Sequence, residues 1–172
     1  MTPTIDPAAV DGPVHDEHAT GEALMTRMTG GELWVARDGV GLDRADLARI
    51  LEVTPAAIAG WEQSKTPVPH RVTETIRGLE STTEDAVARL VAELRAMPDP
   101  RVAIFWKADA VPPGRADAAR YGFRWWRQVV DRALKQVPET RVGSPAEIAA
   151  IETEKLDIEQ GRHREYRREN RA

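Results

Sequence analysis

The sequence predicts a mainly α-helical protein, with a four- to five-helix unit in its first half and a smaller α/β unit in its second. Apolar residues recur at helical spacing over most of residues 28–160. Several of these runs follow a Thr, Asp or Ser that is suited to cap a helix N-terminus. The best strand candidate is "RVAIFW", residues 101–106, which combines β-branched and aromatic side chains.

Residues 1–27 are predicted to form a disordered acidic arm. They hold five acidic residues, one basic residue and three prolines, with few large apolar side chains. Such a segment cannot bury enough surface to offset the entropy of ordering. His15 and His18 flank Asp16 and Glu17, so metal binding is conceivable, but a solvated acidic tail is the favoured interpretation.

Residues 28–81 are predicted to hold four helices. The first covers about residues 30–39, with Leu33, Trp34 and Ala36 facing inward. Asp43 is expected to cap the second, and Thr54 with Pro55 to open the third. A fourth follows "KTPVP", with its inward side chains at Val72, Ile76 and Leu79.

The remaining elements begin with a connecting helix over residues 82–99, capped by Thr82 or Thr83. An α/β unit over residues 100–160 then holds the strand at 101–106, a long helix over 116–137 and a brief second strand at 141–142. Ser144 and Glu147 have the spacing of a capping box for a last helix. Residues 161–172 are predicted to be a basic C-terminal tail that frays.

Residues 44–61 fit the packing of a helix-turn-helix. That motif needs a small side chain where its helices meet and apolar side chains that hold the second helix against the first. Ala48 is the small residue, and the apolar positions are Leu47, Leu51, Val53, Ile58 and Trp61. Glu52 departs from the pattern, since the turn usually has glycine for its left-handed backbone, at a cost of roughly 1 kcal/mol.

The stretch "RADLARILEVTPAAIAGWE", followed by "KTPVP", resembles the repressor-type (XRE-like, lambda-repressor-like) helix-turn-helix family over about residues 29–81. "VAIFW" and "RWWRQVVDRAL" more loosely resemble the C-terminal α/β dimerisation domain of a subgroup that includes anti-CRISPR-associated regulators of phages and mobile elements. The resemblance implies a sequence-specific transcriptional repressor that binds an inverted repeat in double-stranded DNA as a homodimer. It also implies a cytoplasmic location, with the nucleoid as its site of action.

The third helix offers few groups that read bases. Of its expected reading positions only Thr54 can hydrogen bond, whereas Ala56 and Ala57 can only contact thymine methyl groups. Readout is therefore expected to move to the flanks of that helix. The candidate DNA-contacting residues there are Arg44, Gln63, Ser64, Lys65, His70 and Arg71.

The C-terminal half supplies the candidate dimer interface, formed by Phe105, Trp125, Trp126, Val129 and Val130. Arg120, Arg124 and Arg127 are interpreted mainly as a solvated helix face or as partners in salt bridges. The arginine-rich residues 162–171 leave RNA binding open as a weaker alternative.

A second hypothesis is that the helix-turn-helix surface binds protein, as in an antitoxin, an anti-repressor or a phage-encoded inhibitor. The residues over 29–81 are acidic overall, with eight acids against six bases, and the third helix is smooth. The sequence contains no cysteine, no catalytic set and no apolar run that suits a membrane span. We therefore expect no enzymatic activity, no cofactor, no metal and no membrane partner.

Overall fold

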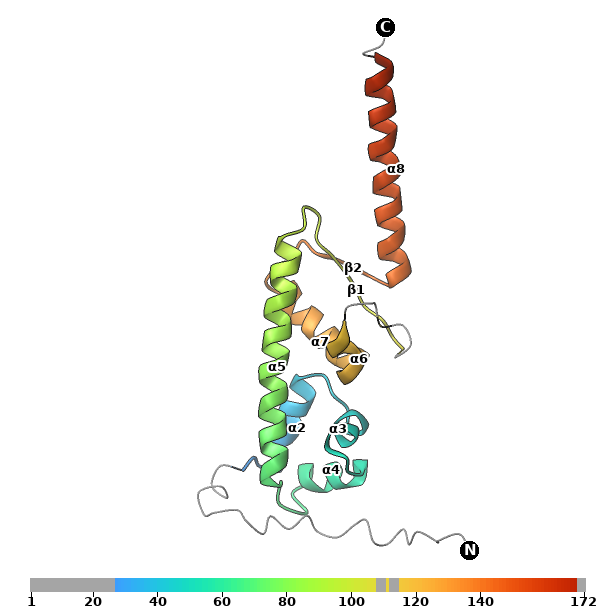
Figure 1. Ribbon diagram of the computed structural model, residues 1–172. Coiled ribbons are helices and arrows are strands. Elements are labelled where there is room, and N and C mark those ends of the chain that lie inside the picture. The colour runs from blue at the N-terminus through green and yellow to red at the C-terminus, as the bar shows by residue number, and fades with distance from the viewer. Residues whose placement is uncertain (1–26, 108–110, 112–114, 170–172) are drawn as a thin grey trace, which may run out of the picture.

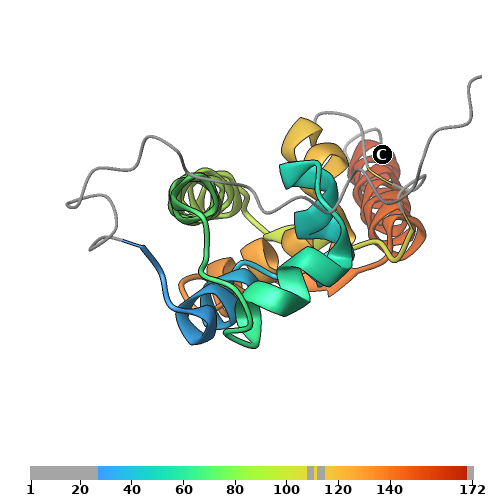
Figure 2. The same ribbon diagram turned by 90° about the horizontal axis from the view of Figure 1, so that it is seen from below.

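The structure of the protein is a computed structural model that describes residues 27–107, 111 and 115–169, with side chains to residue 156 and at 158. It is mainly helical, with one small parallel sheet among these residues. The long helix α5 (His70–Arg95) runs along one side, with α2, α3 and α4 at its N-terminal end (Figure 1). Seen from below, α5 and α8 both appear nearly end-on (Figure 2).

The first three helices are α2 (Gly30–Gly39), α3 (Arg44–Leu51) and α4 (Pro55–Glu62). The predicted caps are confirmed, because Asp43 accepts a hydrogen bond from the backbone N–H of Asp46, and Thr54 from that of Ala57. These bonds satisfy N–H groups that a helix leaves open at its start. Each helix boundary is thus fixed by residues next to it in the sequence.

The inward orientation predicted for Trp34 is wrong. Leu33 is fully buried, but the Trp34 side chain is 56% exposed. The other buried residues of α2 are Gly30 and Arg37, of which Arg37 is only 6% exposed, and Ala36 is partly buried against the core as predicted. Arg37 is four residues after Leu33 and so lies on the same face of the helix, whereas Trp34 lies about 100° away.

Helix α5 joins two helices that the sequence predicted to be separate. Thr82 and Thr83 were predicted to cap a new helix, but their hydroxyls donate to the carbonyls of Gly78 at 2.8 Å and Leu79 at 2.6 Å. A Thr that bonds back by four residues can remain inside a helix. The predicted boundary near residue 81 therefore falls within a continuous helix.

The sheet consists of β1 (Arg101–Ala103) and β2 (Arg141–Gly143), paired in parallel with Val102 opposite Val142. The second strand occurs where it was predicted, whereas the first ends three residues early. Parallel strands need a crossover connection. Here α6 (Ala116–Tyr121) and α7 (Phe123–Leu134) lie in that connection.

The long helix predicted over 116–137 is interrupted at Gly122. That residue has φ +95°, outside the helical region, and it separates α6 from α7. Glycine adopts this backbone conformation without the steric cost that a Cβ imposes. The break lets Tyr121 and Trp125 pack with their ring centroids 5.1 Å apart.

The last helix, α8 (Pro145–Glu169), projects away from the rest of the fold (Figure 1). The predicted capping box is present, with Ser144 accepting from the Glu147 N–H at 3.2 Å and Glu147 accepting from the Ser144 N–H at 2.6 Å. The predicted tail from residue 161 is helical in its backbone as far as Glu169.

One continuous core joins the two halves of the chain. It extends from Leu33 to Val137 and includes the fully buried Trp125, whose indole N–H donates to the Thr83 hydroxyl at 3.0 Å. Helix α7 packs against α5 in the middle of this core. Among the residues described, no helix is both long and apolar enough to cross a membrane.

Candidate nucleic-acid interface

The turn between α3 and α4 sets the relative position of the two helices. Glu52 adopts the left-handed conformation, with φ 56° and ψ 44°, where the motif usually has glycine. The N–H of Val53 then donates to the carbonyl of Ala48 at 3.0 Å. Ala48 is 2% exposed, so its small side chain lies within the packed interior. Leu47, Leu51, Ile58 and Trp61 are also buried, and Val53 is partly buried.

A buried carboxylate links the first three helices. Glu62, at the end of α4, accepts from Nε of Arg37 on α2 and from Nε of Arg44 on α3, each at 2.6 Å. The side chains of Glu62 and Arg37 are 2% and 7% exposed, whereas that of Arg44 is 45% exposed. Arg44, predicted to contact DNA, therefore also helps to fix α4 against its neighbours. This group was not predicted, because it forms only when three helices come together.

The outer face of α4 carries small side chains with few hydrogen-bonding groups, as its sequence suggests. Thr54 and Ala56 are exposed and Ala57 is partly buried. The Thr54 hydroxyl accepts from the Ala57 N–H at 3.2 Å to cap the helix. Its own O–H remains able to donate to a phosphate or a base edge.

The segment after α4 brings polar side chains to the surface. Gln63, Ser64 and Lys65 are all exposed. Ser64 has φ 58°, and the Lys65 N–H donates to the carbonyl of Gly60 at 2.9 Å, which reverses the chain at the helix end. Three of the predicted contact residues therefore share one short, conformationally defined loop.

The start of α5 adds two further predicted contact residues. His70 lies 3.5 Å from Glu74, one turn along the helix, and Arg71 is exposed.

A groove of about 460 Å³ lies between the loop after α4 and the segment that leads into α2. Its lining residues are Arg27, Met28, Thr29, Gly30, Trp61, Ser64, Thr66, Pro67 and Val68.

Gly30 allows the close approach of α2 to α4 beside this groove. A Cβ at Gly30 would lie 2.3 Å from the carbonyl oxygen of Trp61 and 2.8 Å from that of Glu62. Any larger residue would push the two helices apart. The groove therefore lies beside a close contact between α2 and the end of α4.

Residues of α6 and α7 contact α3 at the side of the protein where the core continues into its second half. Arg124 forms ion pairs with Asp43 and, at 3.6 Å, with Asp46, both at the start of α3. Arg49 of α3 donates to the carbonyl of Arg120 at 3.2 Å. The arginines of this region thus bind acids and carbonyls of the same chain, which matches the interpretation of Arg124 as a salt-bridge partner.

The pKa values of the two aspartates beside Arg124 are shifted in opposite directions. Burial acts to raise the pKa of Asp43, but hydrogen bonds from the backbone of Asp46 and the charge of Arg124 outweigh it, so this pKa is lowered. Burial, together with the neighbouring charge of Asp43, raises the pKa of Asp46. The charge of Arg124 favours the ionised form of both carboxylates.

The residues predicted to form a dimer interface lie in the core of the single chain instead. Each is at most 4% exposed; they are Phe105, Trp125, Trp126, Val129 and Val130. They were assigned to an interface because adjacent tryptophans on a helix point in different directions. Trp125 donates to Thr83 on α5 and Trp126 donates to the carbonyl of Ala103 on β1 at 2.9 Å, so elements of the same chain cover both faces.

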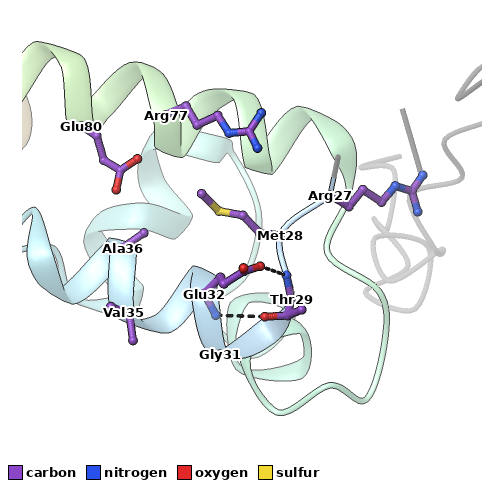
Figure 3. A pocket seen from close by; sticks show the side chains of 9 residues that line it. All are labelled: Arg27, Met28, Thr29, Gly31, Glu32, Val35, Ala36, Arg77 and Glu80. Atoms are coloured by element: carbon purple, nitrogen blue, oxygen red, sulfur yellow. Dashed lines mark hydrogen bonds between the residues drawn. The ribbon is translucent and has the colours of Figure 1, made fainter. Parts of the chain in front are cut away.

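A second groove, of about 910 Å³, lies between α2 and α5 (Figure 3). Met28, Val35 and Ala36 give it an apolar part, and Glu32, Arg77 and Glu80 give it charge. Trp34, beside it on α2, and Val35 are 56% and 70% exposed. Among the described residues, this is the main exposed apolar surface at the end of the protein that α2, α3 and α4 form.

Three predictions fall outside the residues that the structure describes. The disordered arm predicted over residues 1–27 is described only at Arg27. The histidines His15 and His18 belong to residues 1–26, and the side chains of the arginine-rich residues 162–171 are not described. Within the described part, no three His, Asp or Glu side chains gather in a way that could hold a metal ion.

In the comparisons with known proteins, no family model matches this chain and no curated protein matches it significantly.

Proposed function

We propose that the protein is a sequence-specific DNA-binding regulator, in which α4 enters the major groove of double-stranded DNA. The observation that supports this most is the left-handed turn at Glu52, which follows the buried Ala48 and joins two short helices, as a helix-turn-helix motif requires. The outer face of α4 carries small side chains, so the helix backbone itself can come close to the base edges in the groove.

The flanks of α4 supply the polar contacts in this proposal. Lys65, in the loop after α4, and Arg71, in the first turn of α5, are exposed cations, and Ser64 adds a hydroxyl. Phosphate contacts position a protein on DNA and base contacts specify sequence. We assign Lys65 and Arg71 to phosphates, and Thr54 and Gln63 to base edges.

A salt titration of DNA binding tests this assignment. Replacing Lys65 and Arg71 with alanine is expected to weaken binding and to reduce the salt slope by about 0.9 for each phosphate that the variant no longer neutralises. The matched control replaces Arg95 and Arg141, which are exposed on other parts of the molecule. Equal slopes for the two double variants would refute the proposed surface.

The proposal includes a homodimer on an inverted repeat. Since the α7 tryptophans are buried, a second copy would contact apolar side chains that remain exposed, namely Val142 on β2 with Leu156 and Ile158 on α8, which are 41%, 56% and 51% exposed. Sedimentation of a Leu156→Lys, Ile158→Lys variant should show a monomer. A dimer that persists unchanged would place the interface elsewhere.

A protein-binding role is the second candidate. The exposed Trp34 and Val35 beside the groove of α2 and α5 favour it, because aromatic residues are enriched in protein interfaces. A single protein partner in stoichiometric amount, together with no sequence preference for DNA, would decide for this role.

A further inference from the structure

The N-terminal residues leave the fold beside the proposed DNA-reading surface. The N–H of Met28 donates to the Thr73 hydroxyl on α5 at 3.1 Å, and Thr29 caps α2. These bonds fix the point from which residues 1–26 extend. Arg27 and Met28, at that point, line the 460 Å³ groove together with Ser64 and Thr66, the two neighbours of Lys65 in the sequence.

The charges of the two parts are complementary. Residues 1–26 contain five acidic residues and no lysine or arginine. The exposed loop after α4 and the start of α5 carry Lys65 and Arg71, and Glu74 in this region lies against His70. Carboxylates and phosphates are bound by the same cationic and hydroxyl groups. The acidic residues are therefore chemically suited to the sites assigned to DNA phosphates.

The chain is long enough to reach every part of this surface. Twenty-six residues span at most about 94 Å when extended. A segment tethered by a short chain has an effective concentration in the millimolar range, so a weak contact is enough to occupy the site. If the contact has a Kd of about half that concentration, the surface is free only about one third of the time.

We propose that residues 1–26 bind the groove beside α4 and the Lys65–Arg71 flank, and that they compete there with DNA. The competition with DNA rests on the function proposed above, whereas contact between the acidic residues and the groove does not depend on it. The segment would act as a built-in competitor that lowers the affinity for specific and non-specific DNA by the same factor, set by the fraction of time for which it occupies the surface.

The contact can be tested without DNA. The chain has no cysteine, so Ala8→Cys accepts a single spin label. At low salt the label should broaden the amide signals of Ser64, Lys65 and Arg71 but not that of Arg95 at the far end of α5. Neutralising the five acids (Asp6, Asp11 and Asp16 to Asn, Glu17 and Glu22 to Gln) should remove the broadening. Absence of broadening at residues 64–71, or its persistence after neutralisation, would overturn the proposal.

The competition is measured on duplex DNA with the same neutralised variant. A control of equal net charge neutralises five exposed acids elsewhere: Glu84, Asp85, Glu139, Glu152 and Glu154. The arm variant should bind random-sequence duplex about threefold more tightly than this control at low salt, and the difference should shrink as salt screens the contact. Equal affinities would overturn competition. If no variant binds DNA at all, the proposed function fails, and the spin label alone decides whether the segment binds the groove.

Discussion

Replacing Glu62 with glutamine is expected to destabilise the protein by about 3 kcal/mol, at the low end of the range for breaking a buried ion pair. Glutamine has one acceptor oxygen, whereas both carboxylate oxygens of Glu62 are used, one by Arg37 and one by Arg44. One guanidinium would face an NH₂ group instead. Most of the expected loss in unfolding free energy comes from Arg37, because its side chain is 7% exposed and would keep its charge without a partner carboxylate.

The contribution of Arg44 to that magnitude is small. Its side chain is 45% exposed, and an ion pair of this kind contributes at most about 1 kcal/mol. Arg44→Ala should therefore cost about 1 kcal/mol or less, while Glu62→Gln costs several times more. This ratio separates a structural role centred on Arg37 from a general effect of losing surface charge.

Urea denaturation followed by tryptophan fluorescence measures both variants. For a chain of this size, 3 kcal/mol corresponds to a fall in Tm of roughly 6–12 °C. Glu84→Gln on the exposed face of α5 is the control, expected to stay within about 0.5 kcal/mol of the unmodified protein. If Glu62→Gln unfolds at the same urea concentration as this control, the buried link between α2, α3 and α4 does not exist as described.

Three single residues outside this link carry predictions of their own. Glu52→Gly should stabilise the protein by up to about 1 kcal/mol in urea denaturation, because its φ of 56° strains any residue with a Cβ; a clear loss of stability would contradict the left-handed turn. Gly41→Ala should destabilise it, since φ is +77° and a Cβ would lie 2.8 Å from the carbonyl oxygen of Arg124 on α7; unchanged stability would mean that α7 does not dock there. Hydrogen bonds from Ser144 lower the pKa of Glu147 below its ordinary 4.5, so its contribution to the α8 cap is present above pH 4.5 and is lost as the pH falls through the lowered value; an NMR titration should give Glu147 a lower pKa than an exposed glutamate on α8.

Local signals in the sequence predicted the helix boundaries around the motif. Asp43, Thr54 and Ser144 each precede a helix and bond to a backbone N–H three residues later. Such bonds involve neighbours along the chain, so the residue types alone indicate them.

The predictions failed where tertiary contacts outweigh local preference. Thr83 looks like a helix cap in the sequence, but in the fold its hydroxyl bonds within α5 and accepts the indole N–H of Trp125, 42 residues away. The break at Gly122 lies inside an apolar pattern of helical spacing, and only its positive φ reveals it. Neither feature can be deduced from a window of neighbouring residues.

The sequence predicted that the candidate contact residues after α4 would be exposed, but it did not predict the ion pairs that hold the surrounding helices together. The exposure of Gln63, Ser64 and Lys65 follows from their position after α4. The burial of Arg37 and Glu62 does not, because charged residues are rarely buried and their pairing requires three helices to meet. The binding of Arg124 to Asp43, 81 residues apart in the sequence, likewise depends on the docking of α7 against α3.

Selection of bound sequences from random duplex DNA tests the proposed function most directly. The full chain should enrich an inverted repeat whose half-sites lie about 34 Å apart, one helical turn, or a multiple of that distance. Enrichment should disappear when Lys65 and Arg71 are replaced by alanine and persist in the Arg95 and Arg141 control. If the unmodified protein enriches no sequence at low salt, the surface around α4 is not a DNA-reading surface, and the protein-binding role would take its place.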